Sequence, residues 1–224
     1  MKEESILKNE WCKHFNLSAY TSTKFYRIVG CFIVGFEMIK IPNRGLIHPH
    51  LVVYPLWRDD IKLCMKHPYM MYGLLNKKNL QVQLPICELL QTKNEIFKDI
   101  EEFIGFSINT DVIGSDMYSL VNRCLPHQIN DPWRLMDVNE SNIILSAYMN
   151  DRKMYDKAVS SLDAAFIHIS PHLNMIEQFY GKYEDWKNNL LSSFYNRDEI
   201  LARIEKNMAN CKIQSRSVLL PRSE

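Results

Sequence analysis

The sequence lacks several features by which catalytic and cofactor-binding proteins are commonly recognised. It has only 7 glycines, and they form no close cluster, so phosphate-binding loops of the P-loop or Rossmann type are disfavoured. The 6 cysteines are scattered, with no Cys-x-x-Cys pair among them. We therefore predict no cofactor, and we expect the thiols to be reduced and buried as small hydrophobic side chains.

Long apolar segments and an excess of one charge are also missing. The longest apolar run covers residues 29–36, far short of the about 20 residues that span a bilayer. The first residues lack the apolar stretch of a secretory signal, which favours a cytoplasmic protein without a membrane partner. Lysine and arginine number 27 against 26 aspartates and glutamates, so the net charge does not attract nucleic acid, and no nucleic-acid partner is predicted.

What is present is the composition of a folded domain. Hydrophobic residues make up 46% of the chain and charged residues 24%, which is typical of globular proteins that bury a core. We expect a single domain over residues 1–212. Residues 213–224 show no hydrophobic period, and we interpret them as a mobile tail, either native or added for expression.

The N-terminal part has the pattern of an antiparallel β-meander. Residues 25–57 are rich in Phe, Tyr, Ile and Val, and Pro42 and Gly45 mark a turn within them. This pattern predicts a hairpin of two strands, near residues 32–41 and 48–57.

Two further strands are expected beside this hairpin. Residues 25–29 form either a third strand or the front of one long strand with a bulge at Gly30. Residues 80–84 alternate apolar and polar side chains, which predicts a half-exposed strand.

Helical spacing dominates the remainder of the chain. An opening helix is predicted near residues 3–15, and after Pro85 the apolar residues follow a helical period throughout. The predicted segments after Pro85 are 86–104, 112–124, 133–136, 142–149, 154–169, 171–196 and 200–208. The predicted fold class is therefore α+β, with a small antiparallel β-meander packed against a mainly helical C-terminal half.

The best candidates for metal ligands are His48 and His50. Alternate residues of a strand project from the same face, so the two imidazoles can reach one ion. A third ligand would have to come from His67, Asp59 or Asp60. The competing interpretation is that the two histidines only flank a proline at the start of a strand, because two ligands do not make a coordination sphere.

Aromatic residues beside turns suggest a contact surface. Tyrosine, tryptophan and arginine dominate the energetic hot spots of protein interfaces. We therefore predict that a partner protein contacts Tyr26, Arg27, Tyr54, Trp57 and Arg58. The competing interpretation is that these are ordinary side chains of the core or its rim.

A resemblance to a known family rests on the run Phe25-Tyr-Arg-Ile-Val-Gly-Cys-Phe-Ile-Val-Gly-Phe-Glu-Met-Ile-Lys40, which follows an opening helix and precedes a strand at Leu51-Val-Val-Tyr54. In this layout the chain resembles a bacterial family of unknown function whose members are similar to immunity proteins of polymorphic-toxin systems. Such proteins bind and block a toxin without catalysis. The resemblance covers roughly the first quarter of the chain and transfers no individual site.

Immunity proteins against nuclease toxins are often acidic. The near-neutral charge of this chain therefore weakens the case that the toxin is a nuclease and leaves toxins of other kinds open.

Together these patterns favour a cytoplasmic, non-enzymatic protein that binds another protein, with an immunity-type inhibitor of a toxin as the specific expectation. The alternative is a metal-dependent hydrolase or nuclease that uses His48 and His50. Whether the protein is an enzyme stays open, and the oligomeric state is not predicted.

Overall fold

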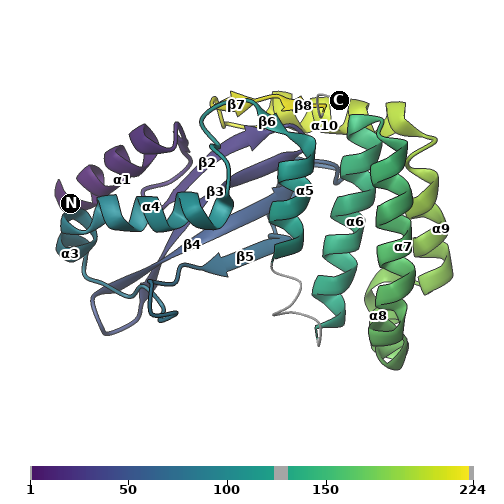
Figure 1. The fold of residues 1–224 in the computed structure, drawn as a ribbon, viewed down its shortest axis with the longest axis horizontal. Coiled ribbons are helices and arrows are strands. Elements are labelled where there is room, and N and C mark those ends of the chain that lie inside the picture. The colour runs from purple at the N-terminus through teal and green to yellow at the C-terminus, as the bar shows by residue number, and fades with distance from the viewer. Residues whose placement is uncertain (1, 124–130, 222–224) are drawn as a thin grey trace.

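The structure is a computed structural model that describes residues 2–123 and 131–221 (Figure 1). Its N-terminal part is an antiparallel β-meander and its C-terminal half is mainly helical, which confirms the predicted α+β class. The strands of the meander, in chain order, are β1 (Ser18–Ala19), β2 (Lys24–Val29), β3 (Phe32–Ile41), β4 (Leu46–Pro55) and β5 (Met70–Gly73).

Tight turns set the register of the meander. Val29 pairs with Phe32, so only two residues connect β2 to β3, and the first of them, Gly30, has a φ of 55°. A side chain is disfavoured at such a φ, which explains the glycine. The predicted hairpin of β3 and β4 is confirmed, and residues 24–29 form a separate third strand rather than the front of a bulged one.

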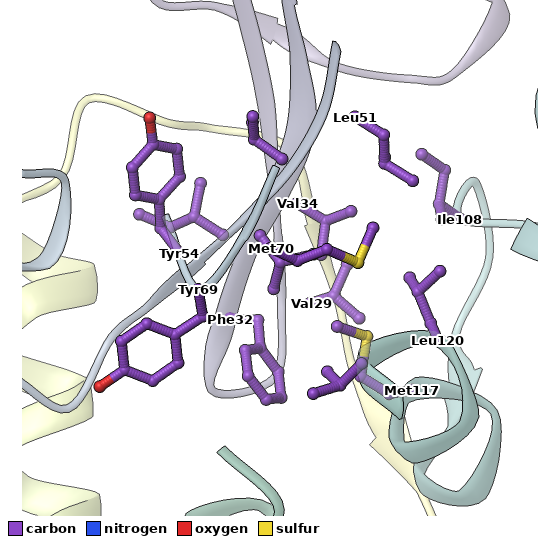
Figure 2. Packing of buried hydrophobic residues seen from close by; sticks show 14 of the residues in the cluster. Val29, Phe32, Val34, Leu51, Tyr54, Tyr69, Met70, Ile108, Met117 and Leu120 are labelled. Carbon is purple, nitrogen blue, oxygen red and sulfur yellow. The ribbon is translucent and has the colours of Figure 1, made fainter. Parts of the chain in front are cut away.

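Helices α1 (Lys2–His14), α3 (Ile86–Gln91), α4 (Lys93–Ile104) and α5 (Gly114–Arg123) lie on one face of the sheet (Figure 1). The ring of Trp11 on α1 contacts Phe36 of β3 and Phe97 of α4, with centroids 5.0 and 5.1 Å apart. Figure 2 shows side chains of the sheet meeting those of α5 and of the segment before it. These buried side chains make up one continuous core.

A second group of helices stands at the end of the sheet (Figure 1). It comprises α6 (Pro132–Met149), α7 (Arg152–Ile169), the 3-10 turn η2 (Ser170–His172), α8 (Leu173–Tyr180), α9 (Tyr183–Ser192) and α10 (Arg197–Asn210). The short helix α2 (Ile61–Cys64) follows β4 and begins at Asp60, whose side chain accepts a hydrogen bond from the Leu63 amide. Among the described residues, no helix is both long and apolar enough to cross a membrane.

The prediction of a mobile tail from residue 213 is wrong for residues 213–221. Strand β7 (Arg216–Ser217) pairs in parallel with β2, and β8 (Leu219–Leu220) pairs in parallel with β6 (Val112–Ile113). The side chains of Ile213 and Leu219 are buried in the core. Strands of two residues are too short to show a hydrophobic period in a sequence. Their partners also lie about a hundred or more residues away, so no local turn marks the pairing.

Three local predictions also need correction. Residues 80–84 form only isolated bridges, Ile47 with Leu84 and Leu75 with Gln81, and the fifth strand of the meander lies instead at Met70–Gly73. The two short helices predicted around residues 133–149 are one continuous α6. The long helix predicted from residue 171 is interrupted at Gly181, which has a φ of 74° and ends α8.

Candidate functional site

A large cavity lies between the end of β4 and the second group of helices. Its volume is about 1170 Å³, which is above the range of about 300–1000 Å³ that small-molecule sites occupy. Aromatic and aliphatic side chains form about half of its lining residues, and eight charged residues lie among them. The lining residues include Trp57, Arg58, Leu63, Tyr69, Trp133, Arg134, Asp137, Glu140, Ile144, Met175, Phe179, Tyr180 and Trp186.

Helix α6 supplies one side of the cavity. Trp133, Asp137, Glu140 and Ile144 follow one another at spacings of four, three and four residues, which places them on one face of the helix. The helix begins at Asp131, whose side chain accepts hydrogen bonds from the amides of the next turn, and a proline occupies the first helical position. This start sets the phase in which the two carboxylates face the cavity.

Glu140 is the centre of a buried polar cluster. Its Oε1 atom accepts hydrogen bonds of 2.8 Å from Trp57 Nε1 and of 2.8 Å from the Tyr69 hydroxyl. Arg58 forms an ion pair with the same oxygen, at 3.2 Å from Nη1, and its Nη2 also donates to the Tyr69 hydroxyl. Burial alone lowers the pKa of the Arg58 guanidinium, but the Glu140 carboxylate outweighs this effect and the pKa lies above its ordinary value. The cluster therefore joins the end of β4 to α6 through an ion pair and two hydrogen bonds to one carboxylate oxygen.

Asp137 lies one turn away from Glu140 and is much less well partnered. Its side chain is 15% exposed, and its nearest cation is Arg134, at 3.6 Å from Nη1 to Oδ2. No described residue donates a hydrogen bond to its carboxylate. Burial, and then the negative charge of Glu140, raise the pKa of Asp137 from 3.8 to about 7. Asp137 is thus an acidic group of the cavity that has spare hydrogen-bonding capacity and changes charge near neutral pH.

Aromatic rings form the wall beyond Asp137. Trp133 meets Phe179 edge to face at 5.3 Å between centroids and lies 5.6 Å from the Tyr180 ring. Phe179 is 75% exposed, and two other apolar residues of the cavity, Leu63 and Met175, are also exposed. Large apolar side chains exposed around a concavity are typical of binding surfaces.

The five residues predicted to contact a partner have different environments. Trp57 and Arg58 line the cavity. Tyr26 and Tyr54 are buried and donate hydrogen bonds of 2.5 and 2.6 Å to Oε1 of Glu37. Arg27 is also buried, with 4% of its surface exposed. The surface role predicted for Tyr26, Arg27 and Tyr54 is therefore incompatible with their positions, because a partner cannot reach them.

His48 and His50 lie on β4, away from the cavity. Their rings are close, with centroids 4.1 Å apart. Within residues 2–123 and 131–221, no group of three or more histidine, cysteine, aspartate or glutamate side chains is placed to hold a metal ion. The third ligand expected from His67, Asp59 or Asp60 is thus not brought to the pair.

Replacing Asp137 with asparagine is expected to stabilise the protein at pH 8 and to have little effect at pH 4. A carboxyl whose pKa is higher in the folded state favours folding while protonated, and this contribution is lost as the pH rises from about 4 to about 7. Asparagine does not titrate, so the variant should gain about 4 kcal/mol over the natural protein above pH 7. Urea denaturation of both proteins from pH 4 to 8 measures the difference, and a difference that does not change with pH contradicts the assignment.

Sequence reasoning missed Asp137 and Glu140 because the polar run around them suggested a break between two helices. Asn139, Ser141 and Asn142 are buried as well, so α6 lacks the usual polar and apolar faces. One signal for the start of this helix was available, namely the Asp-Pro pair at residues 131–132.

Three comparisons, with models of protein families, with curated proteins and with solved structures, gave no match to this chain.

Proposed function

We propose that the protein is a binding protein and that its cavity receives an apolar or aromatic side chain from a partner protein. The observation that carries the proposal is the aromatic wall around a concavity of about 1170 Å³, formed by the exposed Phe179 and the half-buried Trp133 and Tyr180. A folded protein gains nothing in stability from keeping a ring such as Phe179 in water, whereas an aromatic anchor of a partner would cover it.

The composition of the cavity supports a protein segment as the ligand. Tryptophan, tyrosine and arginine line it, and these are the residue types that contribute most of the energy in protein interfaces. Its size and its exposed apolar rim at Leu63, Met175 and Phe179 suit an extended ligand that is only partly enclosed.

The arrangement of the charged groups favours binding over catalysis. The Glu140 carboxylate is already bonded to Trp57, Arg58 and Tyr69. Asp137 can accept or donate a hydrogen bond, but among the described residues no cysteine or threonine lines the cavity. The serine that lines it, Ser193, donates its hydroxyl to the Leu190 carbonyl. A polar group of the partner is therefore expected to meet Asp137 while its apolar part packs against Trp133 and Phe179.

The narrower function, an immunity-type inhibitor of a toxin in the cytoplasm, belongs to the same proposal. Its support is the resemblance of residues 25–40 and 51–54 to the bacterial family described above. The cavity is compatible with such a role, because an inhibitor acts by occupying its partner and needs no reacting groups of its own.

Selection of displayed random peptides on the purified protein tests the proposal. We expect enriched peptides to share an aromatic or leucine anchor and to quench the tryptophan fluorescence of the cavity. Phe179→Asp should weaken their binding by about tenfold or more, because it places a charge on the apolar wall. Phe166→Asp is the control, since Phe166 is a helical phenylalanine outside the cavity, with 36% of its surface exposed.

Two results would contradict the proposal. One is that the selected peptides bind the Phe179→Asp and Phe166→Asp variants with equal affinity, which places their site elsewhere. The other is that native mass spectrometry of the purified protein finds a small molecule bound in equal amount, which makes the cavity a small-molecule site.

A further inference from the structure

The carboxylate of Asp137 meets the cavity with only a shared counter-ion. It lines the cavity with 15% of its side chain exposed, and the Arg134 Nη1 atom lies 3.6 Å from its Oδ2. The same Nη1 atom also donates to the backbone carbonyls of Pro68 and Tyr69. Because this guanidinium is divided among three acceptors, it neutralises the carboxylate only in part.

The other charged groups around the cavity are partnered or lie at its exposed rim. Arg58 is paired with Glu140 at 3.2 Å, and Arg203 donates to the Trp57 carbonyl at 3.2 Å. Asp131 accepts hydrogen bonds from the amides that begin α6. The lining residues with an ionisable side chain at an exposed position are Asp59, Lys66 and His67. Among the described residues, the interior of the cavity therefore offers no spare cation to the carboxylate described above.

Aromatic rings lie beside this carboxylate. Trp133 precedes Asp137 by four residues on α6, so the two side chains are neighbours on one face of the helix. The ring of Tyr180, from α8, lies 5.6 Å from that of Trp133. Burial, and then the charges of Asp137 and Glu140, raise the pKa of Tyr180 to about 12, which places its phenol near both carboxylates. Rings next to a carboxylate favour a cation on an apolar stem, because the stem packs on the rings and the charge is attracted by both.

We propose, as an extension that rests on the proposed function, that the partner inserts a lysine or arginine side chain whose charged end pairs with Asp137 and whose stem packs against Trp133. A cation compensates the buried carboxylate for its lost hydration. An anionic group would instead meet the negative charges of Asp137 and Glu140 together. The basic residue lies beside the apolar anchor that covers the remaining aromatic wall.

The protonation of Asp137 should control this contact. Burial, and then the charge of Glu140, raise the pKa of Asp137 to about 7, so the carboxyl group is mostly protonated at pH 5.5 and mostly ionised at pH 8. A bound cation stabilises the ionised form, so its affinity should increase as the pH rises through 7. The charged and titratable groups around Asp137 are Asp131, Arg134 and Glu140 of α6, Arg58 after β4, Tyr69 before β5 and Tyr180 of α8.

Calorimetric titration with 4-phenylbutylamine and with the neutral 4-phenylbutan-1-ol tests the proposal. The two probes share their apolar part, and the amine keeps its charge from pH 5.5 to 8. At pH 8 the amine should bind about tenfold more tightly than the alcohol, and most of this preference should be lost at pH 5.5. Asp137→Asn should remove the preference and its dependence on pH. Asp163→Asn is the control, because Asp163 is an exposed acid outside the cavity, paired with Lys187 at 2.8 Å.

The proposal is overturned if amine and alcohol bind equally at pH 8, if neither binds, or if Asp137→Asn keeps the preference. Asparagine is close to aspartate in size, and circular dichroism verifies that the variant is folded. Failure of the wider function is seen separately, in the peptide selection. Selected peptides that quench the tryptophan fluorescence but carry no lysine or arginine beside their anchor would contradict the cationic ligand and leave the binding function standing.

Discussion

Replacing Glu140 with alanine is expected to lower the free energy of unfolding by about 3–5 kcal/mol, which is the usual result of removing one partner from a buried ion pair. The change leaves the Trp57 Nε1 and Tyr69 hydroxyl groups without their acceptor, and it leaves the Arg58 charge without its counter-ion. Only 6% of the surface of Glu140 is exposed, so water cannot replace the lost carboxylate.

Chemical denaturation of the variants measures this effect. Asp156→Ala is the matched control, because it also removes one acid from an ion pair, with Arg152 at 2.9 Å, but on an exposed surface. That control should leave stability nearly unchanged. Glu140→Gln should fall between the two, since the amide oxygen still accepts a hydrogen bond but the charge is gone. A Glu140→Ala protein as stable as the control would show that the cluster does not hold β4 against α6.

Replacing Arg27 with alanine is expected to release the C-terminal segment from the sheet and to cost about 3–5 kcal/mol of stability. Arg27 is a buried cation that donates in four directions. Its Nε donates to Ser217 Oγ at 2.7 Å, and its guanidinium donates to the backbone carbonyls of Asn16, Asn109 and Arg216 at 3.0, 3.2 and 2.7 Å. Burial lowers the pKa of the Arg27 guanidinium, and the negative charge of Asp111 offsets part of this effect. The guanidinium therefore stays charged.

Hydrogen exchange of residues 213–221 tests this role directly. In Arg27→Ala we expect these amides to exchange much faster, while those of β3 and β4 stay protected at low denaturant. Arg44→Ala is the control, because Arg44 is exposed in the turn between β3 and β4. Unchanged protection of residues 213–221 in the Arg27 variant would mean that strand pairing alone holds the segment.

The hairpin of β3 and β4 could be predicted from the sequence because its causes are local. Pro42 and Gly45 lie within the turn, and the β-branched and aromatic residues on either side favour extended structure. The same holds for α1 and α7, whose apolar stripes give the helical period directly. Residues 80–84 show the limit of this approach, since a clean alternation there forms only isolated bridges.

The candidate site could be predicted only in part. Trp57 and Arg58 stood out as aromatic and basic residues beside a turn, and they do line the cavity. Tyr26 and Tyr54 had the same appearance in the sequence, yet they are buried around Glu37. Nothing local to a tyrosine shows whether a carboxylate from another strand or open solvent will face it.

The sequence by itself therefore determined the α+β class, the central hairpin and the helical nature of the second half, because turn residues and hydrophobic periods act over a few positions. Tertiary structure alone decided which polar groups meet. Arg58 and Glu140 lie 82 residues apart, and Arg27 and Ser217 lie 190 apart. Buried polar groups must find partners wherever the chain brings them. The cavity and the order of the C-terminal segment therefore follow from contacts that no local pattern encodes.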